Sequence, residues 1–259
     1  MTVHESLLPA TTPRSAFVKL LQSEAKIAWR VPIGLIFGVA FPILLLIIFG
    51  YIPAFSQAAK ALGGLTRLSV YFPILIAMVS AMLALLSLPT HLASYREQGI
   101  LRRMSTTPVP PAWMLAAQVV VNLALAVLSL AILITVGTAG FGLGAPGQAA
   151  GFTLAVVLTI AAMFAIGLWV AAIARTSGEA GIIGQLILGP LLFFAGLWLP
   201  RGQMPSLLRH FSDYSPLGAG VHALQDAMQG SFPSAQSLLT LVAYTAVFAF
   251  LAARFFRWD

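Results

Sequence analysis

The chain contains 259 residues, of which 59% are hydrophobic and 8% are charged, and its formal net charge is +7. A soluble domain carries about 25% charged residues and covers most of its surface with polar groups, so this composition excludes a soluble protein. The apolar runs are continuous and do not alternate with polar residues, which favours spanning helices over a β-barrel. We therefore expect an all-α polytopic membrane protein. Because the sequence contains no cysteine, disulfides and thiol chemistry are excluded within it.

The first thirty residues predict a tail followed by a surface helix. Residues 1–13 are polar, and we interpret them as a flexible cytoplasmic tail. Residues 14–30 have the spacing of an amphipathic helix. Its apolar residues are Phe17, Leu20, Leu21, Ala25, Ala28 and Trp29, and they are interleaved with Lys19, Glu24 and Lys26. The basic residues and the tryptophan favour a helix that lies on the membrane surface; the alternative is a water-exposed tail helix.

Residues 31–259 are interpreted as a six-span transmembrane domain. Each span is an apolar segment long enough to cross a bilayer core of about 30 Å. We place the spans at about 31–51, 68–92, 113–138, 149–174, 180–199 and 235–256. Pro42 is expected to kink the first span. The fifth span is the weakest as a helix because it contains Gly181, Gly184, Gly189 and Pro190.

The segment between the fifth and sixth spans, residues 200–233, is expected to be structured. It contains two sets of residues that would each share one face of a helix. The first set is Leu207, Leu208 and Phe211, and the second is Val221, Leu224, Gln225 and Met228. This pattern predicts two short amphipathic helices that dip into the outer leaflet.

The basic residues predict the orientation of the chain in the membrane. If the N-terminus is cytoplasmic, that side collects Arg14, Lys19, Lys26, Arg30, Arg96, Arg102, Arg103, Arg175, Arg254 and Arg257. The other side keeps Lys60, Arg67, Arg201 and Arg209. Cytoplasmic loops carry the excess of Lys and Arg, so we expect both termini to be cytoplasmic.

A search for chemistry in the sequence finds no catalytic or metal-binding pattern. There is no G-x-x-x-x-G-K-[ST] loop for a nucleotide and no G-x-S-x-G elbow for a serine nucleophile. His4, His91, His210 and His222 lack metal-ligand spacing. No acidic residue lies in the middle of a span, as an ion-coupled secondary transporter would require; Glu179 beside Arg175 is interpreted as an ion pair at a span end. The pattern favours a transporter that takes its energy from another polypeptide.

The charged segment after the second span is the most informative part of the sequence. It places Arg96, Glu97, Arg102 and Arg103 between two long uncharged segments. Ile100, Leu101 and Met104 would share one face of a short helix there. A basic, amphipathic loop helix is suited to contact a cytoplasmic partner. The alternative is a plain topology signal, although the positive-inside rule alone does not require an apolar face.

Two groups of motifs carry a resemblance to a known family. The loop YREQGILRRMSTTP at 95–108 matches the family pattern in Glu97, Gly99, Thr107 and Pro108. The second group is FAGLWLP at 194–200, Met204-Pro205, YSPLG at 214–218 and HAL at 222–224. In this order and spacing, the chain resembles the permease subunit of ABC type-2 exporters, close to the daunorubicin and multidrug branch. The resemblance covers nearly the whole chain and implies outward re-entrant helices between spans five and six.

The resemblance also implies function, partners and site residues. The loop would be a coupling helix that contacts a separately encoded ATPase through Arg96, Glu97, Gly99, Ile100, Leu101, Arg102, Arg103 and Met104, with a second contact at Arg175 and Glu179. Two ATPases would bind ATP and Mg²⁺, while this chain would bind no cofactor and would pair with a second permease in the bacterial cytoplasmic membrane. The cargo would be a hydrophobic drug, antibiotic or lipid, with polysaccharide, haem or peptide as alternatives. Spans two and five would line its pathway with Met78, Met82, Phe193, Phe194 and Leu197, residues that could equally face lipid or other helices.

Overall fold

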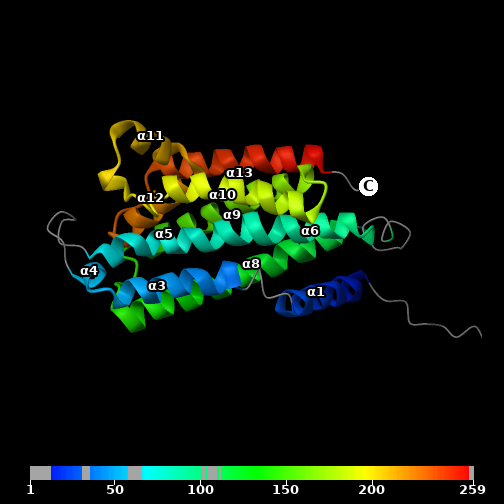
Figure 1. Cartoon of the computed structure of the whole chain (residues 1–259), viewed down its shortest axis with the longest axis horizontal. Coiled ribbons are helices and arrows are strands. Elements are labelled where there is room, and N and C mark those ends of the chain that lie inside the picture. Colours follow the sequence, from blue (N-terminus) through cyan, green and yellow to red (C-terminus); the bar gives the residue numbers. More distant parts are fainter. Residues whose placement is uncertain are drawn as a thin grey trace, which may run out of the picture.

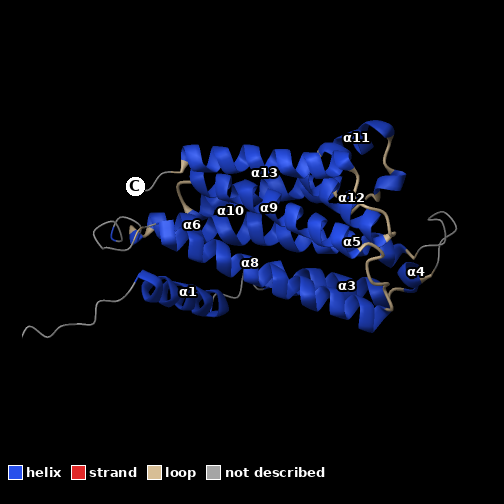
Figure 2. Ribbon diagram, turned by 180° about the vertical axis from the view of Figure 1, so that it is seen from behind, coloured by secondary structure: helices blue, strands red, loops and turns tan. Residues whose placement is uncertain are grey.

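The protein is a bundle of long helices that run roughly side by side. The computed structural model describes residues 13–30, 36–57, 66–100, 103, 110 and 112–256, and most of these are helical. Helix α1 lies at the same end of the bundle as the described C-terminal end but on the opposite side, and α4, α11 and α12 lie toward the other end (Figures 1 and 2). The helices are α1 (Pro13–Arg30), α3 (Phe41–Tyr51), α4 (Pro53–Ser56), α5 (Arg67–Met82), α6 (Leu88–Glu97), α8 (Ala112–Thr135), α9 (Ala149–Ile173), α10 (Ser177–Phe194), α11 (Ser206–Tyr214), α12 (Pro216–Met228) and α13 (Ala235–Phe255).

Among the described residues, five helical segments are long and apolar enough to cross a membrane. They are Arg67–Glu97, Ala112–Gly140, Ala149–Ile173, Ser177–Phe194 and Ala235–Phe255. These segments match the second to sixth predicted spans and confirm the all-α polytopic class. A shorter apolar helix, Gly38–Tyr51, occupies the place of the first span, whose predicted start at residues 31–35 lies outside the described residues.

The fifth span ends earlier than the sequence predicts. Helix α10 stops at Phe194 and does not reach Leu199. Gly196 has φ +93°, and the N–H groups of Gly196 and Leu197 donate to the carbonyls of Phe193 and Leu192, at 3.0 and 3.1 Å. This is a Schellman motif, in which a left-handed glycine satisfies the last carbonyls of a helix.

Two spans contain a π-helical turn shortly before a proline. The turn η1 (Ile36–Ala40) precedes Pro42, and the turn η3 (Leu83–Ser87) precedes Pro89. A proline removes one backbone donor and its ring clashes with the carbonyl four residues earlier, and a wider turn relieves that clash. Pro42 therefore lies in the first turn of α3, directly after the π-helical turn η1. In the other span, α5, η3 and α6 continue as one helical segment.

The span formed by α5, η3 and α6 is the centre of the core. Leu75, Met78 and Leu85 on this span are completely buried. Two glycines pack directly on its backbone: a Cβ added to Gly167 on α9 would overlap the Ala84 carbonyl, and one added to Gly184 on α10 would overlap the Leu85 carbonyl. The close approach of three backbones at η3 fixes α9 and α10 against the central span.

The outer surface of the bundle is apolar, as expected for helices in lipid. Leu186, Leu239 and Phe250 are each more than two-thirds exposed. The two short helices predicted between spans five and six are present as α11 and α12. Helix α12 is buried against α9, α13 and α5, whereas Leu207 and Phe211 on α11 are exposed.

Candidate coupling site

The candidate site is the end of α6, where the central span leaves the bundle. Helix α6 ends at Glu97, and Gly99 with φ +66° turns the chain; its N–H donates to the Arg96 carbonyl at 3.0 Å. The Arg103 N–H then donates to the Gly99 carbonyl at 3.1 Å. The predicted coupling residues Leu101, Arg102 and Met104 lie outside the described residues. Described Ile100 packs against the cluster of Tyr95 and Met114, which Leu20 of α1 also contacts.

The Arg96 side chain joins the end of α6 to the end of α9. Its guanidinium donates to the carbonyls of Ala174 (2.7 Å) and Ala171 (3.2 Å), and it lies 5.3 Å from the centroid of the Phe256 ring. The last carbonyls of a helix have no partner within the helix and attract a cation. Arg96 therefore caps the C-terminal end of α9, and its contact with a partner protein stays a prediction.

The Glu97 carboxylate joins the same point to the start of α10. One of its oxygens accepts hydrogen bonds from the Ser177 N–H (3.1 Å) and the Ser177 hydroxyl (2.9 Å). Ser177 is the first residue of α10, so the carboxylate lies at the positive end of the helix dipole. Arg96 and Glu97 together attach the loop between α9 and α10 to the end of the central span.

The second predicted contact, Arg175 and Glu179, forms this attached loop. Thr176 caps α10 by accepting from the Glu179 N–H at 3.1 Å, and the Glu179 carboxylate accepts from the Arg175 N–H at 2.8 Å. This reciprocal arrangement resembles a capping box. The expected ion pair is thus corrected: where the chain is described, Glu179 bonds the backbone of Arg175 and not its guanidinium.

A buried polar cluster joins α6 to α1 and α8. Glu24 of α1 is 1% exposed, and its Oε2 accepts hydrogen bonds from the Tyr95 hydroxyl at 2.5 Å and from the Gln118 amide. The Gln118 amide also donates to the Tyr95 hydroxyl oxygen at 2.9 Å, and Asn122 donates to the Gln118 side-chain oxygen at 3.2 Å. We call Glu24, Tyr95, Gln118 and Asn122 the Glu24 cluster.

The Glu24 cluster differs from what the sequence predicts for α1. Burial raises the pKa of the Glu24 carboxyl, and the hydrogen bonds from Tyr95 and Gln118 offset part of that effect. Glu24, which is expected among the charged residues of a surface helix, is buried by the packing of α1 on α8. One sequence signal of a buried polar group was present: Gln118 and Asn122 are two amides four residues apart in a mostly apolar helix, although they do not indicate Glu24 or Tyr95 as partners.

The predicted pathway residues differ in their burial within the single chain. Met78 and Met82 are buried in the core of the single chain. Phe193, Phe194 and Leu197 are half-buried near the far end of α10, where the rings of Phe193 and Phe194 are 5.6 Å apart and Phe194 approaches Phe211 of α11. The structure therefore does not bring all five side chains to one open surface.

The comparison with protein families agrees with this architecture. The ABC-2 type transporter family matches residues 15–229, which include α1 except its first two residues, the end of α6 and the two short helices α11 and α12. The chain belongs to the ABC-2 type transporter family. A comparison with curated proteins finds no match. Members of this family are permease components of ABC transporters, and they generally work with a separate ATPase and often as dimers.

Proposed function

We propose that this chain is the membrane-spanning permease subunit of an ATP-driven exporter that moves hydrophobic small molecules outward by alternating access. ATP and Mg²⁺ would bind to a separately encoded ATPase, present in two copies. The observation that carries the proposal is the end of α6, where Arg96 and Glu97 attach the α9–α10 loop beside the segment that resembles a coupling helix. The family membership supports an ABC permease over an ion-coupled carrier.

The hydrogen bonds at the end of α6 give a route for motion from the ATPase. A displacement of residues 97–104 would act on α9 and α10 through Arg96 and Glu97, and on α1 and α8 through Tyr95. Packed helices move as rigid bodies because their interfaces have few intermediate arrangements. The expected output is a tilt of the bundle that opens one side of the membrane and closes the other.

A second permease would complete the pathway. The α10 side chains Ile182 and Leu186 are 65% and 69% exposed, and they lie on one face of the helix that the family resemblance places at the dimer axis. Phe193 and Leu197, farther along the chain, would line the pathway near its outward end. Met78 and Met82 would have to become exposed by movement of α5 before they could contact cargo. The exporter is proposed to lie in a bacterial cytoplasmic membrane with both termini inside.

The coupling role is tested by substitution of Leu101 followed by co-purification with the ATPase and measurement of export in cells. Leu101→Asp places a charge on a face proposed to enter an apolar groove, so the permease is expected to insert normally and to lose its ATPase. The matched control Leu101→Met keeps an apolar side chain of similar volume and is expected to retain both binding of the ATPase and export. Wild-type co-purification and export by Leu101→Asp would contradict the coupling role.

A second variant separates attachment of the ATPase from transmission of its motion. Glu97→Ala removes the acceptor of both Ser177 hydrogen bonds at an exposed position. The ATPase is therefore expected to remain bound while export falls. Ser177→Ala removes one of the same two bonds and should give a smaller loss in the same direction, and a normal export rate in both variants would exclude this route.

A further inference from the structure

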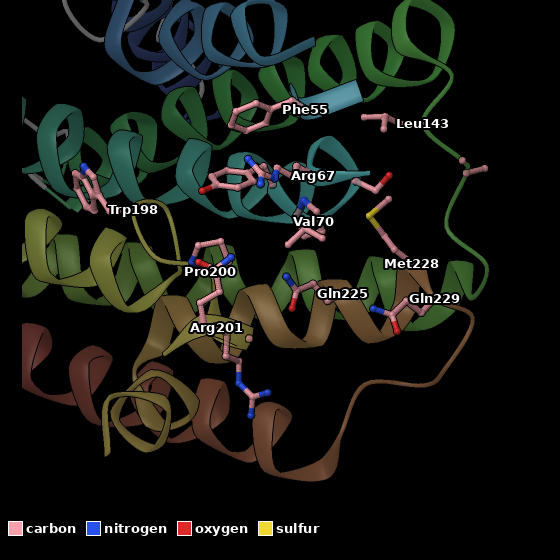
Figure 3. Close-up of a pocket in the computed structure, with 17 residues that line it drawn as sticks. Phe55, Arg67, Val70, Leu143, Trp198, Pro200, Arg201, Gln225, Met228 and Gln229 are labelled. Carbon is pink, nitrogen blue, oxygen red and sulfur yellow. The ribbon is translucent and has the colours of Figure 1, made fainter. Parts of the chain in front are cut away.

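A cleft of about 870 Å³ opens at the end of the bundle opposite α1. The cleft is lined by residues from α4, the first turns of α5, the connection between η4 (Val136–Gly140) and α9, the segment that follows α10, and the end of α12. Figure 3 shows their side chains around the opening. This volume lies within the range of small-molecule sites, about 300–1,000 Å³. The cleft is separate from the coupling site, and nothing in the coupling mechanism uses it.

The walls of the cleft differ in chemistry. One part is aromatic: Phe55 and Tyr71 pack edge-to-face with centroids 5.3 Å apart, and Trp198 is 62% exposed. Another part carries the amides of Gln225 and Gln229 on α12 (Figure 3). Aromatic faces accept an apolar body, and amide N–H groups donate hydrogen bonds to anionic oxygens.

Among the described residues that line the cleft, Arg67 supplies a positive charge. The other lining arginine, Arg201, donates to both carboxylate oxygens of Asp213, at 2.6 and 2.8 Å, and its guanidinium points away from the cleft in Figure 3. That ion pair holds the pKa of Asp213 below its ordinary value even though burial opposes ionisation. Within the described part of the chain, Arg67 has no carboxylate at ion-pair distance, and no acidic residue lines the cleft.

We propose that this cleft binds an anionic amphiphile, with a carboxylate or phosphate headgroup on Arg67 and an apolar portion against Phe55 and Trp198. The anionic headgroup would neutralise the charge of Arg67, and the amides of Gln225 and Gln229 would donate further hydrogen bonds to it at the same opening. The proposal deepens the proposed function, on which it rests, because it names the class of cargo that leaves the exporter. The same headgroup chemistry is also present in anionic lipids of the surrounding leaflet.

The proposal is tested by direct binding of a charged probe and its neutral partner. The probe is 11-(dansylamino)undecanoic acid, and the partner is its methyl ester, which differs in the headgroup charge. Both are titrated by fluorescence into the purified full chain in phosphatidylcholine nanodiscs, with empty nanodiscs subtracted. The acid is expected to bind about tenfold more tightly than the ester, as one charge-assisted headgroup contact implies.

Three variants assign that preference to the cleft. Arg67→Gln should bind the acid no better than the ester. Trp198→Ala should weaken the acid and the ester by the same factor because it removes apolar wall and no charge. Arg209→Gln makes the same charge change outside the lining of the cleft and should leave the preference unchanged. Equal affinities for acid and ester in the wild type, or an undiminished preference in Arg67→Gln, would overturn the proposal.

The lipid composition of the nanodisc distinguishes the two sources of the headgroup. If phosphatidylglycerol displaces the acid from the wild type, lipid headgroups compete for the cleft; if it does not, the cleft prefers a free anionic amphiphile over lipid headgroups. Both outcomes are consistent with an anion-binding site at Arg67 and differ only in the molecule that supplies the headgroup. The titration uses neither the ATPase nor transport, so a failure here leaves the exporter assignment standing, and failure of that assignment leaves the binding result standing.

Discussion

Glu24 shows how a charged residue of a surface helix becomes part of the protein interior. Its Oε2 accepts from Tyr95 and Gln118, while Oε1 has no hydrogen-bond partner in the described structure. A carboxyl held in this way is stabilised in its neutral form, because burial penalises the charge. The Glu24 cluster therefore connects α1 to α6 and α8 through hydrogen bonds, and its contribution to stability depends on the protonation of the Glu24 carboxyl.

We expect two substitutions of Glu24 to have different effects on stability. Glu24→Ala leaves the Tyr95 hydroxyl without its acceptor and leaves the Gln118 amide with only the Tyr95 oxygen, so it should cost about 1–3 kcal/mol. Glu24→Gln keeps an accepting oxygen and stays neutral at every pH. Thermal unfolding in detergent measures both variants, with Lys26→Gln on the exposed side of α1 as the control.

The pH dependence of the same variants gives the sign of the pKa shift. The pKa of Glu24 is higher in the folded chain than in the unfolded chain, so its contribution to stability is complete below about pH 4.3 and is lost as the pH rises through the folded pKa. Wild-type stability should therefore fall relative to Glu24→Gln over that window and then level off. A constant difference at all pH values would show that the carboxyl titrates normally.

At the scale of helices, the glycines of α10 differ in what surrounds them. A Cβ at Gly184 would overlap the backbone carbonyl of Leu85, whereas a Cβ at Gly189 meets nothing within 4 Å. Glycine lowers the helix propensity of this span, but at Gly184 the absence of a side chain is required because α10 contacts the η3 turn there. The same residue type at Gly189 has no contact of this kind.

This difference predicts opposite effects of one substitution at two positions of α10. Gly184→Ala should push α10 from the central span and destabilise the chain by about 1–3 kcal/mol. Gly189→Ala should be neutral or stabilise it by about 0.4–1 kcal/mol, because it restricts the unfolded chain without a clash. Unfolding midpoints in one detergent compare them directly, and equal midpoints would show that α10 does not approach η3 as closely as the structure indicates.

For the whole molecule, the ends of the bundle should lie on opposite sides of the membrane. The α1 end carries most of the basic residues, and the other end carries α11, α12 and the cleft. In the cysteine-free chain, Gln203→Cys and Gly230→Cys are expected to react with an impermeant maleimide in intact cells, and Lys19→Cys and Ile100→Cys only after lysis. Reaction of the second pair in intact cells, with none of the first, would reverse the orientation.

The sequence by itself determined the class of the protein, the positions of the five long spans and the presence of α11 and α12. These features depend on hydropathy and helical periodicity, which are properties of neighbouring residues. The loop at 95–108 also indicated the family, since its motif is contiguous. The end of α10 was misplaced because Gly196 is one of several glycines in this region. The residue type alone does not show which of them adopts the left-handed conformation that ends the helix.

Only the tertiary structure decided which polar side chains meet. Tyr95 reaches Glu24 across 71 positions, Gln118 reaches it across 94, and Arg96 reaches Ala174 across 78. No local pattern encodes such pairs, because they depend on which faces of α1, α6, α8 and α9 pack together. For the same reason Met78 lies in the core, and Arg67 faces a cleft whose walls come from five separate parts of the chain.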